Sequence, residues 1–193
     1  MGNGTKTSSV NAAPAHGWRL RDLEHADAGW IARACADAEI QRWTLVPRPY
    51  ALAHAEAFVA GRHDERRVWV IAEAGPSAAS PSVAGAEGPD GAAGAGVISV
   101  HGIDAAGDAE LGWWVAPWAR RRGAATTALG LVCVVLAADG GVRRAVAKIA
   151  GTNVASLAAA RAAGFSVVDG ACTDACPDGA DRVPAVVVGR SLR

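Results

Sequence analysis

The residues with the clearest chemistry form a basic turn, Arg120-Arg-Arg-Gly-Ala-Ala125, which contains a single glycine. The turn follows a strand-like run, Glu110 to Val115, and opens an apolar helix-like run, Ala124 to Ala138. The first turn of a helix offers unpaired backbone N–H groups and the positive end of the helix dipole. Gly123 lets the backbone approach a ligand closely, and the arginines add charge-assisted donors for phosphate oxygens. The turn therefore predicts a site for a phosphorylated ligand; the alternative is a surface loop with solvated arginines.

Two common phosphate-binding motifs do not fit this turn. No Gly-Lys-Ser/Thr sequence follows, as a Walker loop would require. The Gly-x-Gly pair of a Rossmann fingerprint is also missing. The ligand must therefore be identified from the rest of the chain.

Several segments in the right order resemble the GNAT family of N-acetyltransferases. Gly112-Trp-Trp-Val-Ala-Pro117 with Arg120-x-x-Gly123-x-Ala125 resembles the core motif of that family, and Asn153-x-x-Ser156 followed by Gly164-Phe165 resembles its second acetyl-CoA-binding element. The segment from Trp43 to Phe58 is similar to the RimJ/RimL-type branch. The resemblance runs from about Trp18 to the C-terminus and excludes residues 74–96.

This resemblance implies acetyl-CoA as co-substrate and no metal. Register with the family pattern puts Arg120 at the first position of the motif and Arg122 directly before the glycine, which leaves Arg121 as a solvated side chain. Trp113 to Val115 would form a strand splayed from its neighbour, with the Val115 N–H polarising the thioester carbonyl. The implied cofactor-binding residues are Trp113, Trp114, Val115, Arg120, Arg122, Gly123, Ala124, Ala125, Thr126, Asn153 and Ser156.

The resemblance also implies catalytic roles for two residues. Glu110 matches the proposed base of RimI/RimL-like enzymes, which would help the amine lose its proton before attack; the alternative is a solvent-facing glutamate. Ser156 matches the suggested proton donor to the departing thiolate, or is simply a residue in the first turn of a helix. Many GNAT enzymes use a tyrosine as the acid, but the only tyrosine here is Tyr50, far away in sequence. Asn153 fits both a helix N-cap and a cofactor ligand, and His101, ending a strand near the presumed cleft, is a candidate auxiliary base.

The implied reaction is direct transfer of acetyl to a primary amine in a ternary complex. The acceptor is a small-molecule amine or a protein N-terminus. Two alternatives remain: another acyl donor such as succinyl-CoA, and a CoA-binding sensor or regulatory module without catalysis. The family analogy also makes a homodimer possible.

The composition of the chain indicates which kinds of partner it binds and in which cellular compartment it is expected. The chain of 193 residues has a formal net charge of zero, which disfavours nucleic-acid binding. The longest apolar run, residues 128–138, is too short to cross a bilayer, and no signal peptide is visible. Cys35 and Cys133 fall in apolar helical patterns, so they indicate core residues in a reduced, cytoplasmic protein. The Cys172 to Asp178 spacing does not match a standard zinc pair and is more typical of a turn between strands.

Hydrophobic periodicity predicts one α/β domain over residues 18–193, an α+β mixed sheet with helices on both faces, as in the GNAT acyl-CoA N-acyltransferase fold. Residues 1–17 are expected to be a disordered leader, and residues 74–96, which carry almost no large apolar side chain, a flexible low-complexity loop. The expected strands are 18–23, 68–73, 97–101, 109–115, 144–149, 165–168 and 183–189, and the expected helices are 27–37, 51–61, 124–138 and 155–163.

Overall fold

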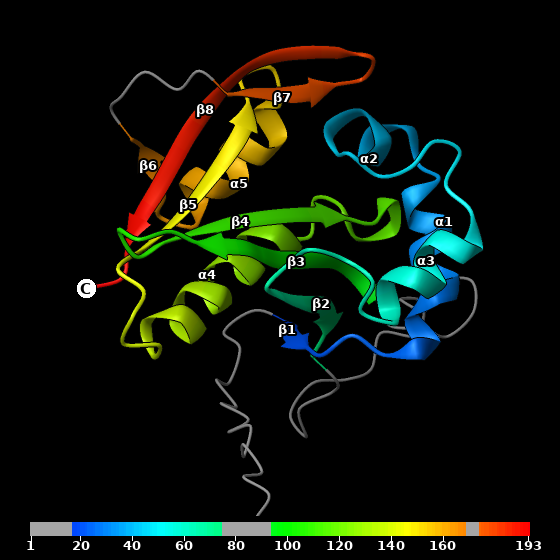
Figure 1. The fold of residues 1–193 in the computed structure, drawn as a ribbon, viewed down its shortest axis with the longest axis horizontal. Helices are drawn as coiled ribbons and strands as arrows, with labels where there is room; N and C mark the ends of the chain where they lie inside the picture. The colour runs from blue at the N-terminus through cyan, green and yellow to red at the C-terminus, as the bar shows by residue number, and fades with distance from the viewer. Residues whose placement is uncertain (1–16, 75–93, 169–173) are drawn as a thin grey trace, which may run out of the picture.

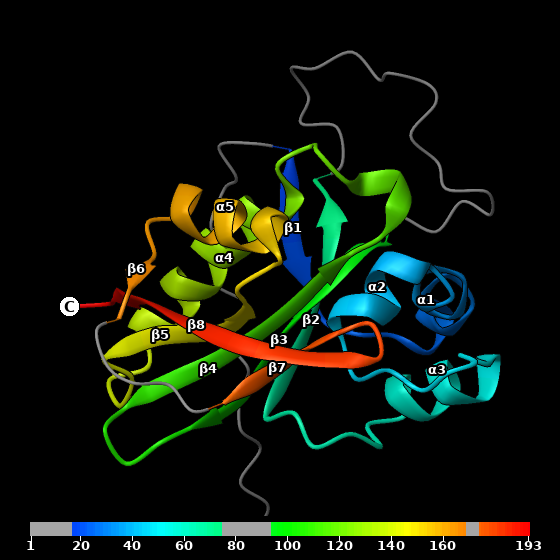
Figure 2. The same ribbon diagram turned by 90° about the horizontal axis from the view of Figure 1, so that it is seen from above.

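The computed structural model describes residues 17–74, 94–168 and 174–193. One mixed sheet runs through the molecule, with helices on both of its faces (Figures 1 and 2). The strands are β1 (Trp18–Arg21), β2 (Arg67–Glu73), β3 (Gly94–Ile103), β4 (Asp108–Val115), β5 (Arg144–Ala150), β6 (Ser166–Val167), β7 (Ala175–Asp178) and β8 (Asp181–Ser191). The α-helices are α1 (Ala28–Cys35), α2 (Ala38–Trp43), α3 (Leu52–Val59), α4 (Ala124–Ala137) and α5 (Val154–Ala162), and short 3-10 turns span His25–Asp27 and Pro117–Ala119.

The sheet has the order β1-β2-β3-β4-β5-β8-β6, and β7 pairs with β8 at its edge. Strands β1 to β4 are antiparallel neighbours, whereas β4 and β5 are parallel. A parallel pair needs a crossover connection, which α4 supplies. The mixed sheet predicted from the sequence is therefore confirmed.

Two apolar cores lie on opposite faces of the sheet. Alternate strand residues such as Ile98, Leu111 and Ala147 pack with α4 and α5 on one face. Residues such as Val70 and Val97 pack with α1 and α3 on the other. The sheet thus separates the α4/α5 side from the α1–α3 side, which fixes the face on which each strand side chain lies.

The apolar run after the basic turn forms a helix because its core-facing residues repeat at helical spacing. Ala128, Leu129, Val132, Cys133 and Leu136 of α4 are all buried. Burial raises the pKa of the Cys133 thiol, as expected for a small core residue in apolar surroundings.

Several element boundaries differ by a few residues from the sequence analysis, and two elements were not predicted. Strand β3 begins at Gly94 rather than Val97, because the backbone there passes close to other groups: a Cβ at Gly94 would lie 2.1 Å from the Trp30 ring. Helix α2 was not predicted, since its six residues bury only Ile40. Residues Ala175–Asp178 form strand β7, not only a turn, because β8 begins at Asp181 and supplies the pairing partner.

Some sequence-based expectations lie outside the described residues. These are the leader up to residue 16, the loop over residues 75–93, and Cys172. Among the helices that are described, none has the length and apolar character needed to span a membrane.

Candidate active site

The sheet opens between its two central parallel strands. The β4–β5 pairing covers only Asp108 with Arg144, Ala109 with Ala145, and Glu110 with Val146. Beyond Glu110, β4 pairs with β3 alone, and β5 continues along β8. Figure 1 shows the two strands meeting at one end and diverging toward α2. Within residues 17–74, 94–168 and 174–193, no strand pairs with one edge of β4 from Leu111 to Val115.

Strand alternation decides which backbone groups face this opening. Ala116 N donates to Ala95 O of β3 at 2.8 Å. Trp114 O also lies on the β3 side, since a Cβ built on Gly96 would be 2.3 Å from it. Because backbone groups of successive strand residues point to opposite sides, the N–H groups of Trp113 and Val115 face away from β3, toward the opening. The sequence analysis expected free backbone groups over the same residues.

The tryptophans of β4 lie on different faces, as strand alternation requires. Trp113 packs against the core on the α4 side. Trp114 packs against the α1–α3 core, with its ring centroid 5.8 Å from that of Trp30. Both side chains are only partly buried.

The basic turn sits at the end of β4 and leads into α4. Gly123 is the N-cap of α4 and has a left-handed backbone, with φ at 79°. No atom of the described residues lies within 4 Å of a Cβ built on Gly123, so the approach to its backbone is open. The first-turn N–H groups of Ala124, Ala125 and Thr126 find no helical or side-chain acceptor in the part of the chain that the structure describes. This arrangement suits an anion.

The three arginines of the turn have different partners. Arg120 pairs with Asp37. Arg122 pairs with Glu73, lies over the Trp18 ring at 5.1 Å, and accepts a 2.8 Å hydrogen bond from Trp18 Nε1 at its carbonyl oxygen. Arg121 is exposed and has a positive φ of 61°, unusual for a residue with a Cβ. These partners, which come from β1, β2 and the start of α2, could not be read from the sequence.

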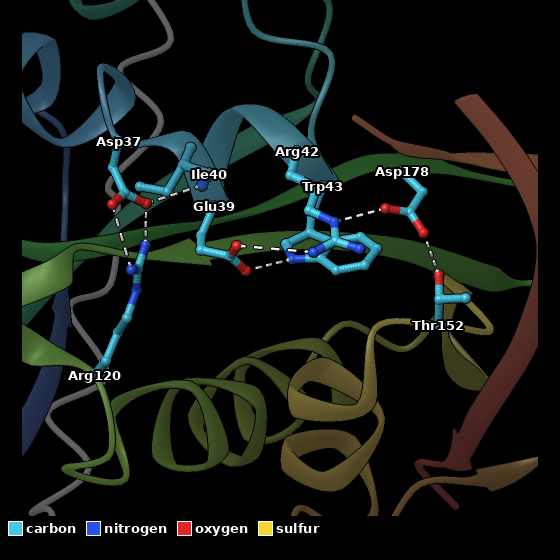
Figure 3. A network of polar contacts seen from close by, with 8 residues as sticks. All are labelled: Asp37, Glu39, Ile40, Arg42, Trp43, Arg120, Thr152 and Asp178. Carbon is cyan, nitrogen blue, oxygen red and sulfur yellow. Dashed lines mark hydrogen bonds and ion pairs between the residues drawn. The ribbon is translucent and has the colours of Figure 1, made fainter. Parts of the chain in front are cut away.

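The second element begins α5, at the end of β5. Asn153 is the N-cap, and its side-chain oxygen accepts a 3.0 Å hydrogen bond from Ser156 N. Asn153 is buried, whereas Ser156 is half-buried on the first turn. The N-termini of α4 and α5 thus follow the two strands that part, and Figure 3 shows these helices side by side below α2. The capping role expected for Asn153 is confirmed.

Glu110 lies at the point where the strands separate. Its carboxylate is 3.1 Å from Lys148 Nζ, and Lys148 is in turn 2.9 Å from Asp174. His101 Nδ1 is 3.9 Å from the other carboxylate oxygen of Glu110. Hydrogen bonds to Asp174 and Glu110 raise the pKa of Lys148, so its ammonium stays charged. Sequence reasoning did not find Lys148 or Asp174, although Lys148 is the only lysine after residue 17.

Helix α2 bridges the two sides of the opening (Figure 3). At one end, Asp37 caps α2 through Ile40 N at 3.0 Å and binds Arg120. At the other end, Arg42 Nε is 2.6 Å from Asp178, whose second oxygen accepts from Thr152 Oγ1 at 2.8 Å. Thr152 precedes α5, so α2 is tied both to the turn after β4 and to the loop after β5.

The arginine partners at the two ends of α2 favour the ionised forms of Asp37 and Asp178. Burial alone would raise the pKa of Asp37, but hydrogen bonds from Arg120 and from the Ile40 N–H outweigh it and lower the pKa. Hydrogen bonds from Arg42 and Thr152 lower the pKa of Asp178. Both carboxylates therefore remain available as partners of the arginines at neutral pH.

A surface pocket of about 380 Å³ lies between the loop after α2 and the β7–β8 turn. Leu45, Arg48, Pro177 and Arg182 are among its lining residues. Arg48 donates to Gly179 O at 2.9 Å, which joins the two walls of the pocket. No group of three or more potential metal ligands occurs in the described ranges.

The family comparison identifies the domain. Residues 18–166 match the family model described as an acetyltransferase (GNAT) domain. No curated protein matches the sequence.

Solved structures with the same fold include several acetyltransferases. RimL, a ribosomal L7/L12 alpha-N-protein acetyltransferase in complex with coenzyme A, has a TM-score of 0.70 at 18% identity, covering 93% of this chain and 95% of that one. The microcin C7 self immunity acetyltransferase MccE, in complex with acetyl-CoA and AMP, has a TM-score of 0.72 at 16% identity, with 91% and 92% covered. Spermidine N-acetyltransferase from Vibrio cholerae, in complex with CoA and spermine, has a TM-score of 0.67 at 15% identity, with 91% and 96% covered.

Proposed function

Because the chain belongs to the GNAT family of acetyltransferases, we propose that it transfers an acetyl group from acetyl-CoA to a primary amine by direct transfer in a ternary complex. The observation that carries this proposal is the opening between β4 and β5, flanked by the N-termini of α4 and α5. An extended thioester arm needs amide partners along its length, and the free edge of β4 offers them. Solved structures of the same fold hold CoA or acetyl-CoA.

The diphosphate of the cofactor would bind at the basic turn. The open approach to Gly123 and the free N–H groups of Ala124, Ala125 and Thr126 support this assignment. Arg120 and Arg122 add charge, although each must exchange a carboxylate partner for phosphate. Asn153 and Ser156 would border the cofactor from the first turn of α5.

Three groups of the chain would act on the reacting atoms or on their protons. The Val115 N–H faces the opening and would polarise the thioester carbonyl as negative charge develops on its oxygen. Glu110 would take part in removing the proton of the acceptor amine. Ser156 would supply a proton to the departing thiolate sulfur.

The acceptor is proposed as a small-molecule amine or a protein N-terminus. The solved relatives include enzymes named for both kinds of acceptor, a ribosomal protein and spermidine. The pocket beside the β7–β8 turn would contact the part of the acceptor remote from its amine. A homodimer and a cytoplasmic location are further parts of this proposal.

Thiol release from acetyl-CoA tests the proposal. We expect CoA-thiol release that depends on an added amine, measured over a panel of polyamines, aminoglycosides, amino acids and short peptides, with the acetylated product identified by mass spectrometry. The same panel with succinyl-CoA tests the choice of acyl group. Binding of acetyl-CoA with no release for any amine would instead favour a CoA-binding sensor.

A further inference from the structure

Four ionisable side chains meet beside the last β4–β5 pair. Ala109 and Leu111 belong to the core on the α4 side, so Glu110 between them points to the opposite face, and the same alternation places Lys148 there. These four residues come from β3, β4, β5 and the position before β7: His101, Glu110, Lys148 and Asp174.

The four side chains form a row in which each contacts the next, from Asp174 through Lys148 and Glu110 to His101. Lys148 lies between Asp174, at 2.9 Å, and Glu110 Oε2, at 3.1 Å. The remaining oxygen, Glu110 Oε1, is the one nearest His101 Nδ1. Lys148 thus holds one carboxylate oxygen of Glu110, and the other oxygen is left on the side of His101. This geometry suits Glu110 to orienting the imidazole.

His101 reaches over strand β4 because residue 112 is a glycine. A Cβ built on Gly112 would lie 2.4 Å from His101 Nε2 and 2.6 Å from Cε1, so any other residue type would displace the imidazole from this position. The imidazole thus covers the residue just before Trp113, where the backbone first faces the opening. Its side chain is 49% exposed, and Nε2 has no hydrogen-bond partner among the described residues.

We propose that His101 is the group that accepts the proton of the acceptor amine, and that Glu110 acts through His101 as a positioning residue. This inference rests on the proposed acetyl transfer. Nδ1 is the ring nitrogen nearer Glu110, at 3.9 Å, and when Nδ1 carries the proton the lone pair of the neutral ring is on Nε2, next to Gly112. A base oriented by a carboxylate at its second nitrogen is a recurrent arrangement for proton transfer.

The proton balance is complete without another reactant. The acceptor arrives as an ammonium ion and gives one proton to His101 Nε2, which leaves a neutral amine and an imidazolium. The nitrogen lone pair forms the C–N bond to the thioester carbon, and the C–S bond breaks with its electron pair on sulfur. Ser156 gives its hydroxyl proton to that sulfur and regains one from the nitrogen, which gives the amide and the CoA thiol. His101 then releases its proton to solvent.

The charged groups near His101 come from several elements. Glu110 on β4 lies 3.9 Å from His101, and Lys148 on β5 with Asp174 holds Glu110 in place. From the side of β2, Arg66 and Arg67 lie beside this part of β3, since Arg66 N–H donates to Val100 O at 2.8 Å and Arg67 pairs in register with Val100. Among the described residues, Glu110 is the carboxylate paired with His101.

The test compares acetyl transfer by wild type, His101→Ala and Glu110→Gln, with His25→Ala as a matched control at an exposed histidine. The acceptor is the panel amine that gives the fastest thiol release. We expect His101→Ala to lower kcat by about 100-fold while the dissociation constant for CoA stays within about twofold. Added free imidazole should restore turnover to His101→Ala in a saturable way and leave Glu110→Gln unchanged. The double variant should be no slower than His101→Ala alone.

The outcomes separate the two proposals. An active wild type with an equally active His101→Ala variant overturns the role of His101 alone. Loss of activity in Glu110→Gln with full activity in His101→Ala assigns the base to Glu110 instead. Loss of turnover without imidazole rescue makes His101 structural and also contradicts the inference. A wild type that binds CoA but acetylates no amine overturns the proposed function, and this inference with it.

Discussion

Arg120 of the basic turn forms an ion pair with Asp37, the N-cap of α2, across 83 positions of sequence. The pair joins the segment proposed to hold phosphate to the helix that bridges the opening of the sheet. A diphosphate that recruits Arg120 must therefore compete with the Asp37 carboxylate. The proposed binding of the cofactor would therefore be coupled to the position of α2 through Arg120.

Asp37 both caps α2 and pairs with Arg120, and the substitution Asp37→Ser removes only the second of these roles. Serine still caps α2 but offers no charge to Arg120. Since an exposed ion pair is worth at most about 1 kcal/mol, we expect CoA to bind about two- to fivefold more tightly. Isothermal titration calorimetry measures the change, and Asp181→Asn, an exposed carboxylate remote from Arg120, is the control. Unchanged or weaker binding would show that Arg120 does not leave Asp37 for the ligand.

Gly123 allows a matched test of the phosphate site. Asn and Asp both tolerate the left-handed backbone of Gly123, so the two substitutions strain the turn alike. Asp adds a negative charge next to the proposed diphosphate, and we expect Gly123→Asp to weaken CoA binding at least about tenfold more than Gly123→Asn.

Arg122→Ala provides a second measure of the same site. We expect a loss of roughly tenfold in CoA affinity, because one charge-assisted contact is removed. Arg62→Ala, at an exposed arginine with no ion pair in the described ranges, is the control. Equal CoA affinity for the Asn and Asp variants, together with no effect of Arg122→Ala, would remove the basic turn as the diphosphate site.

Arg121 carries backbone strain that a glycine would relieve. Its φ of 61° costs a residue with a Cβ roughly 1 kcal/mol or more. We expect Arg121→Gly to raise the free energy of unfolding by about 1 kcal/mol, measured in urea. Arg121→Ala, which keeps the Cβ, should show no such gain. An equal gain in both variants would mean that the side chain, not the backbone, is the source.

The ionisation of Asp27 makes the free energy of unfolding depend on pH. Burial would raise its pKa, but hydrogen bonds from Arg21, from the Trp30 indole and from the Glu24 N–H outweigh burial and lower it. A carboxylate with a lowered folded-state pKa stabilises the fold above its unfolded pKa, near 4, and this contribution disappears as the pH falls through the folded value. Asp27 is 2% exposed and its partner Arg21 is partly exposed, so the ion pair is partly buried.

Asp27→Asn should therefore lower the free energy of unfolding by roughly 2–4 kcal/mol at pH 7. The difference from wild type should shrink as the pH falls below about 4. Denaturant unfolding at a series of pH values measures both effects, with Asp181→Asn as the exposed control. A difference that is the same at all pH values would show that packing, rather than charge, explains the loss.

Most elements could be predicted because they depend on local pattern. The apolar run of α4, the Asn153 cap of α5 and the alternation of β4 each signal their structure within about ten residues. Helix α2 lacks such a signal, because six residues with one buried side chain are too few for a helical period. Strand β7 depends on pairing with β8, which no local pattern reveals.

The sequence by itself determined the order of strand, basic glycine turn and helix, and with it the family. The order is local, since it rests on hydrogen bonding and backbone preferences of neighbouring residues. Only the tertiary structure decided which side chains meet: Asp37 with Arg120, Arg42 with Asp178 across 136 positions, and Lys148 with Glu110. These contacts arise because the sheet brings β4 and β5 together and lets them part at Glu110, and that geometry is a property of the whole sheet rather than of any one segment.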